Sequence, residues 1–179
     1  MRAYLFFVIL ALFLSACSQN SGNGRNNDRY EKKIRKEVLT IAENYATNNL
    51  TDAKKTVMEN GITTIGNDQK MYVIDPAKIF FGYIDSDTKN DAIVSLCPYQ
   101  GQYEITTEHL IIIQTDGRLI LIRSLESDMR ILGIKDGIIT AEVPEYSRNS
   151  PLFNCPSCWE VVKFQFIKGE LIKTDLTTE

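Results

Sequence analysis

Three Xaa-Gly dipeptides, each between two short apolar segments, constrain the fold of this chain most strongly. They are Asp116-Gly117, Asp136-Gly137 and Lys168-Gly169. Both central residues of a tight hairpin turn adopt positive φ angles, which glycine tolerates without steric cost and aspartate tolerates better than most residues. Each dipeptide therefore predicts a turn between two antiparallel strands. The flanking strands are expected at residues 110–113 and 118–122, 131–135 and 138–143, and 161–167 and 171–174.

Two further segments, residues 78–84 and 91–96, are rich in Val, Ile and Phe and also predict strands. Because most neighbouring segments are joined by short turns, we expect an antiparallel meander sheet of about seven or eight strands.

Helical periodicity precedes the strands. Apolar residues recur every three or four positions, which predicts one face of an amphipathic helix at residues 29–48, and Asp28 with Glu31 resembles a capping box at its start. Thr51 as N-cap and Gly61 as terminator predict a second short helix at residues 51–60. The apolar face consists of Tyr30, Ile34, Val38, Ile41 and Tyr45.

The fold class is therefore α+β, with one or two N-terminal helices packed on the meander sheet. Residues 29–179 are expected to form a single domain, since that length supports one hydrophobic core. Residues 17–28 have no large apolar side chain and cannot bury enough surface to offset their ordering entropy, so we expect a flexible tether.

The N-terminus combines a positive charge at Arg2 with an uncharged apolar run over residues 3–16. This run is too short to span a bilayer comfortably and favours a signal peptide of residues 1–16. Its Leu-Ser-Ala-Cys ending resembles the bacterial lipobox, which implies that Cys17 becomes the first residue and receives a lipid anchor. More than one acyl chain gives stable membrane attachment. We expect an extracytoplasmic protein, and Ser18 after the cysteine favours the outer membrane, at its periplasmic face or the cell surface, if the cell is Gram-negative.

An acidic loop separates the strands expected at 78–84 and 91–96. Asp85, Asp87 and Asp91 provide carboxylates at the near-alternate spacing from which loops bind Ca²⁺. The segment resembles the loop G-D-x-[ND]-x-D-G-x-x-D-A of many secreted bacterial β-domains, but Tyr83 stands at its first acidic position and Thr88 at its glycine. The alternative is that these carboxylates accept backbone N–H groups and hold a turn.

Besides Cys17, the chain has Cys97, Cys155 and Cys158, an odd number for an oxidising compartment. We expect a structural disulfide, either between Cys155 and Cys158 or from one of them to Cys97. Two other interpretations stay open. The Cys155-Pro156-Ser157-Cys158 spacing is that of redox motifs, and the three cysteines with His109, the only histidine, have the ligand types of a tetrahedral zinc site.

Composition and motifs argue against several functions. Twenty basic against 23 acidic side chains give no general attraction to nucleic acid. The chain has no Gly-x-Ser-x-Gly elbow, phosphate loop, dinucleotide fingerprint or His-Glu-x-x-His helix. We therefore expect a non-enzymatic, monomeric lipoprotein without a resident cofactor that binds an envelope protein or glycan. The alternative is a thiol-redox or metal-handling protein that uses Cys97, Cys155, Cys158 and His109.

Residues 78–176 resemble a group of uncharacterised secreted or lipid-anchored bacterial domains. The shared features are a Gly-x-x-Asp-x-Asp-x-x-x-Asp-Ala-(Ile/Val)-Val segment at residues 82–94, a Lys-Asp-Gly hairpin at 135–137 and Cys155-Pro156. The resemblance implies a β-rich fold and a secreted setting, and it brings no known activity.

Overall fold

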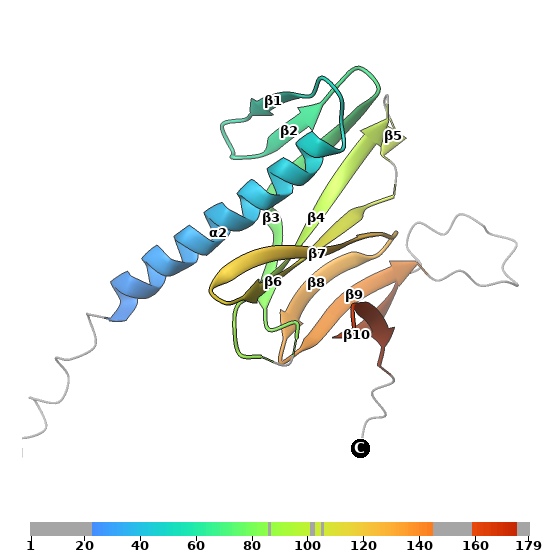
Figure 1. Cartoon of the computed structure of the whole chain (residues 1–179). Helices are drawn as coiled ribbons and strands as arrows, with labels where there is room; N and C mark the ends of the chain where they lie inside the picture. Colours follow the sequence, from blue (N-terminus) through green and yellow to red (C-terminus); the bar gives the residue numbers. More distant parts are fainter. Residues whose placement is uncertain (1–22, 86, 101–102, 105, 145–158, 175–179) are drawn as a thin grey trace, which may run out of the picture. The chain divides into compact units, whose positions relative to one another are not determined.

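The computed structural model describes residues 23–85, 87–100, 103–104, 106–144 and 159–174 (Figure 1). By its internal contacts the chain divides into two compact units, residues 1–37 and 38–179. The described residues form one helix and eleven strands: α2 (Asn23–Asn48), β1 (Lys54–Val57), β2 (Thr63–Gly66), β3 (Lys70–Gly82), β4 (Asp91–Gln100), β5 (Tyr103–Glu104), β6 (Glu108–Thr115), β7 (Arg118–Glu126), β8 (Arg130–Lys135), β9 (Ile138–Pro144), β10 (Trp159–Ile167) and β11 (Glu170–Lys173).

The strands form two antiparallel sheets. The first sheet has the order β1-β2-β3-β4-β6-β7, with the short strand β5 paired to the end of β4. The second sheet has the order β11-β10-β9-β8. The α+β class is confirmed, but the prediction of a single meander sheet is wrong.

The break between the sheets lies at residues 127–129, which join β7 to β8. The N–H of Ser127 still donates to the carbonyl of Thr107 beside the first sheet, and the Ser127 hydroxyl then accepts the N–H of Met129. This side-chain turn redirects the chain, because the segment lacks the Xaa-Gly pair that would fold β8 back onto β7.

All three predicted Xaa-Gly hairpins are confirmed. The first residue of each pair has a φ of 50–52° and its glycine a φ of 74–87°. The pairs connect β6 to β7, β8 to β9 and β10 to β11. Local turn chemistry therefore set these three strand pairings.

The second helix expected at residues 51–60 is wrong. The segment holds a turn and strand β1, which pairs with β2. Gly61 does adopt a positive φ of 83°, but it turns the β1–β2 hairpin instead of ending a helix. Strand pairing within the sheet overrides the local N-cap signal of Thr51.

The first helix is confirmed over residues 29–48 but begins earlier, at Asn23. Asp28 therefore lies within the helix and not at its N-cap, and the last six residues of the expected tether are helical. Extending a helix that has already formed costs only the ordering of each added residue, so it needs no cap signal at the predicted start. Within the described residues, no helix is both long and apolar enough to cross a membrane.

Strands β4 and β6 form the centre of the molecule. Residues 91–96 of β4 and 108–113 of β6 are all buried, which means that both faces of these strands are covered. One face packs against the second sheet in a cluster that includes Ile93, Ile111, Ile131 and Ile139. The alternate residues of these strands point to the other face, where Glu108 contacts α2.

The helix contacts its side of the sheet through Tyr45. Its hydroxyl donates a hydrogen bond to the Glu108 carboxylate, and its ring lies edge-on to the ring of Tyr72. Burial and the Glu108 carboxylate raise the pKa of Tyr45 and of Tyr72 to about 12, so both phenols stay protonated and can donate. Val38, Ala42 and Ala46 on α2 are fully buried.

The two sheets are in close contact where β3 ends. A Cβ atom added to Gly82 would lie 2.6 Å from Cγ2 and 2.7 Å from Cβ of Ile134 on β8. Only glycine allows this approach, because both atoms belong to the branched stem of the Ile134 side chain, which cannot move aside without its backbone.

We expect Gly82→Ala to lower the free energy of unfolding by about 2 kcal/mol, since the added methyl overpacks the junction of the sheets. The measurement is urea denaturation followed by circular dichroism. Gly133→Ala on β8 is the matched control, because a Cβ there meets nothing within 4 Å. Equal effects of the two substitutions would contradict a tight junction at Gly82.

Candidate functional site

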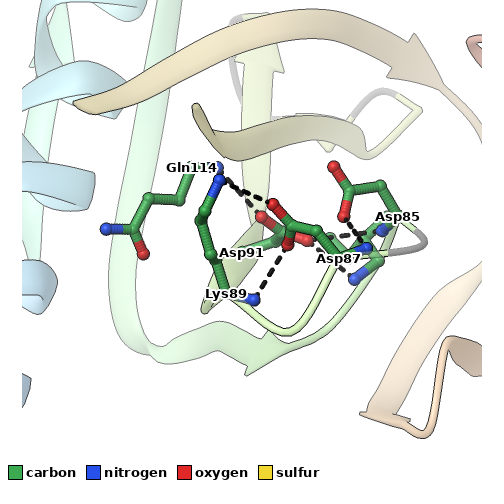
Figure 2. A network of polar contacts seen from close by, with 6 residues as sticks. Asp85, Asp87, Lys89, Asp91 and Gln114 are labelled. Atoms are coloured by element: carbon green, nitrogen blue, oxygen red, sulfur yellow. Dashed lines mark hydrogen bonds and ion pairs between the residues drawn. The ribbon is translucent and has the colours of Figure 1, made fainter. Parts of the chain in front are cut away.

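The sequence predicted that Asp85, Asp87 and Asp91 lie together, and the structure confirms this. One carboxylate oxygen from each lies within 4.8 Å of the others. Asp91, the first residue of β4, is fully buried. Its Oδ2 accepts the backbone N–H groups of Ile84 at 2.8 Å and Asp85 at 3.4 Å, and its Oδ1 accepts that of Gln114 at 2.9 Å (Figure 2).

The other two carboxylates are also bonded within the loop. Asp85 Oδ1 accepts the N–H of Asp87, and Asp87 Oδ1 accepts that of Lys89, each at 2.8 Å. Asp87 Oδ2 forms an ion pair with the Lys89 ammonium at 3.0 Å, as Figure 2 shows. Hydrogen bonds from the backbone N–H and the ammonium of Lys89 lower the pKa of Asp87, whereas burial raises that of Asp91.

These contacts match the alternative interpretation of the loop, in which carboxylates hold a turn. All the oxygens named above already accept N–H groups or an ammonium, whereas Ca²⁺ takes six to eight oxygen ligands. For an ion to bind all three carboxylates, the Lys89 ammonium would have to leave Asp87 Oδ2. Calcium binding at Asp85, Asp87 and Asp91 therefore stays a hypothesis.

The same loop borders an open cleft of about 420 Å³. Asp85 and Asp87 line one side of this cleft, and Asp136, from the β8–β9 turn, lines it from the second sheet. Aromatic and aliphatic side chains complete the lining, among them Tyr83 and Ile167, both 42% exposed, and Phe166. The cleft therefore combines three carboxylates with apolar surface.

A second set of buried polar groups consists of His109, Ser95 and the carbonyl of Met129. His109 on β6 stands opposite Ser95 on β4 in the strand register. Its Nδ1 lies 2.9 Å from the Ser95 hydroxyl and its Nε2 lies 3.2 Å from the Met129 carbonyl oxygen. A carbonyl only accepts, so Nε2 holds the proton, and Nδ1 accepts the hydrogen bond that Ser95 donates.

Burial lowers the pKa of His109 to about 4. The ring is 1% exposed, so the charged imidazolium would lose its hydration. His109 is therefore neutral at physiological pH, and its two hydrogen bonds join β6 to β4 and to Met129, the residue before β8.

Cys97 and His109 both line a cavity of about 130 Å³, which Ser95 lines as well. The zinc hypothesis needs both residues to meet Cys155 and Cys158 as well, and those two cysteines lie outside the described residues. Both ring nitrogens of His109 already have partners, however, so binding a metal would break one of those hydrogen bonds. Cys17, Cys155 and Cys158 lie outside the described residues, and the lipid-anchor, disulfide, redox and zinc interpretations stay predictions.

Several residues of these sites were not expected from the sequence. Asp136 was assigned only to a turn, and Ser95, Lys78 and Arg130 were assigned no role. One signal could have indicated Ser95: it interrupts an otherwise apolar strand, and a polar residue buried in a strand needs a partner. Lys78 and Arg130 give no such signal, because the sequence does not show which strands enclose the cavity.

We expect Asp91→Asn to lower the free energy of unfolding by about 3 kcal/mol, because an amide nitrogen would face a backbone N–H and the charge-assisted bonds would be lost. Urea denaturation measures this effect. Asp87→Asn is the matched control at a half-buried carboxylate whose ion pair with Lys89 is open to solvent, and it should change stability little.

The same two variants test the calcium hypothesis. A rise in the melting temperature of the unmodified chain with added calcium, absent in Asp87→Asn, would support an ion. No effect of Asp91→Asn on stability would contradict the structural role of Asp91.

His109 should make the protein less stable in acid. Its pKa is about 4 in the folded chain and about 6.5 in the unfolded chain. The unfolded chain therefore binds the proton first as pH falls, so the stabilisation is complete above pH 6.5 and is lost through pH 4. This single group should reduce the free energy of unfolding by roughly 3 kcal/mol between pH 7 and pH 4.

The comparison is with His109→Gln, unfolded in urea at several pH values. The variant should be less stable at pH 7 but should lose roughly 3 kcal/mol less on acidification, because the remaining titrating groups are unchanged. Parallel pH profiles for the two proteins would contradict a neutral, buried His109.

Comparisons with protein-family models, curated proteins and solved structures find no match. The function of this chain is therefore argued from its own residues and their geometry.

Proposed function

We propose that this chain is a membrane-anchored, extracytoplasmic lipoprotein that acts by binding another component of the cell envelope. The anchoring rests on the N-terminal sequence, in which an apolar segment ends in Leu-Ser-Ala-Cys at Cys17. The binding role rests on one structural observation, the open cleft between the Asp85–Asp87 side of the loop and the β8–β9 turn.

The lining of the cleft favours a partner group that has a positive charge and an apolar stem. Asp85, Asp87 and Asp136 supply negative charge, of which the Lys89 ion pair offsets one unit. Tyr83 and Phe166 supply surface against which a methylene chain or a cation can pack. A lysine or arginine side chain of an envelope protein has this chemistry, and an amino sugar of a glycan shares it.

The hydrogen bonds of the carboxylates in the cleft favour binding over catalysis. Two of the carboxylates that line it, Asp85 and Asp87, accept N–H groups of their own loop, and His109 lines the other cavity instead. A general base needs to reach the reacting proton, and rigid, bonded carboxylates suit recognition better. We therefore propose no enzymatic activity at the cleft.

The first arm of the test is intact-mass analysis of the native product. We expect an acylated polypeptide that begins at Cys17, and an unacylated product when Cys17 is replaced by Ala. A full-length, unmodified chain would contradict the anchor.

The second arm is cross-linking in intact cells through a photoreactive residue at position 83, which lines the cleft. Position 57 is the control, because Val57 is 60% exposed on β1, in the first sheet. We expect an adduct from position 83 that Asp136→Asn reduces severalfold, since asparagine keeps the turn and removes the charge. Equal adducts from both positions, or no effect of Asp136→Asn, would contradict recognition in the cleft.

A further inference from the structure

The smaller cavity, of about 130 Å³, differs from the cleft in its charge. An irregularity in the pairing of β3 and β4 leaves residues 75–78 opposite Ser95, because Ile74 pairs with Leu96 and Ile79 with Val94. Lys78, at the end of this bulge, lines the cavity, and Arg130 at the start of β8 lines it as well. No carboxylate belongs to the described residues that line it.

The two cations have unused hydrogen-bonding capacity. Lys78 forms no ion pair with another described residue. The Arg130 guanidinium lies 3.9 Å from the ring centroid of Trp159, a contact that uses its face and leaves N–H groups at its edge. Glu142 approaches one of them only to 4.0 Å. Each cation can therefore donate to a further group.

The floor of the cavity adds no competing charge. Ser95, His109 and the Met129 carbonyl satisfy one another, and His109 is neutral. Thr107 also lines the cavity, and its hydroxyl is a further donor. The cavity therefore presents hydrogen-bond donors and two positive charges. None of the described side chains that line it is an anion.

We propose that this cavity binds a small oxyanion of the phosphate type, held between Lys78 and Arg130. The cavity is smaller than the roughly 300 Å³ at which pockets for larger organic ligands begin, so it admits a single anionic group and not a nucleotide. Arginine donates to two phosphate oxygens at once, and lysine supplies a compact charge. The anion is either free phosphate or the phosphate of an ester. This inference is independent of the cleft.

Trp159 provides a built-in reporter, because it is the only tryptophan of the chain and it contacts Arg130. The experiment titrates the full chain with inorganic phosphate at pH 7 and records tryptophan fluorescence. Potassium chloride holds the ionic strength constant, since screening alone would otherwise change the signal. We expect a saturable change with phosphate and none with chloride.

The variants locate the site. Lys78→Ala should weaken phosphate binding at least tenfold while the contact of Arg130 with Trp159 remains. Arg130→Ala should abolish binding, measured by calorimetry because this variant also alters the reporter. Lys54→Ala removes a lysine from β1 that is exposed as Lys78 is, and this variant should bind as the unmodified chain does. Urea midpoints of all variants verify that each is folded.

Titration with glycerol phosphate distinguishes the two sources of the anion. Tighter binding of glycerol phosphate than of inorganic phosphate supports an ester such as a lipid headgroup, and the reverse order supports the free ion. Either order supports the cavity as an oxyanion site. A response that does not saturate, or one that Lys78→Ala leaves unchanged, would overturn the proposal.

Discussion

The burial of β4 and β6 on both faces governs the rest of this structure. A central strand covered by a helix on one side and a second sheet on the other has no access to water. Every polar side chain on it must therefore find a partner inside the protein, because an unpaired buried polar group costs a few kcal/mol. Among the described residues, no buried side-chain nitrogen or oxygen lacks a hydrogen bond.

Four polar residues on these strands show how the constraint is met. Asp91 binds three backbone N–H groups and fixes the start of β4, while Glu108 accepts a hydrogen bond from Tyr45 and holds the helix. Ser95 and His109 pair across the strands, and His109 extends the link to Met129. These groups are structural, yet they support the surfaces proposed to bind ligands: Asp91 positions the acidic loop beside the cleft, and the Ser95–His109 pair forms the floor of the cavity.

The proposed sites have opposite charge within one domain. Carboxylates surround the cleft, and two cations border the cavity, although the chain as a whole has a formal charge of only −3. The net charge of the chain therefore does not indicate either site, because the electric field at a concave surface depends on the few charges that line it. By the two proposals together, the protein would bind a basic group on one surface and an anionic group on another.

The sequence was informative wherever one residue type is required by local geometry. Asp116-Gly117, Asp136-Gly137 and Lys168-Gly169 predicted their hairpins, since positive φ angles at both positions exclude most other residues. The closeness of Asp85, Asp87 and Asp91 was also predictable, because one short loop contains all three. By contrast, Thr51 and Gly61 gave a wrong helix, since their local preferences are weaker than pairing with β2.

By itself the sequence thus determined the turns, most strands, the main helix and the acidic loop, all of which depend on neighbours along the chain. Only the tertiary structure decided that the strands divide into two sheets, that Tyr45 meets Glu108 and that Lys78 and Arg130 share a cavity with His109. These contacts join residues far apart in sequence, and their energy comes from burial and pairing across strands, which no local pattern encodes.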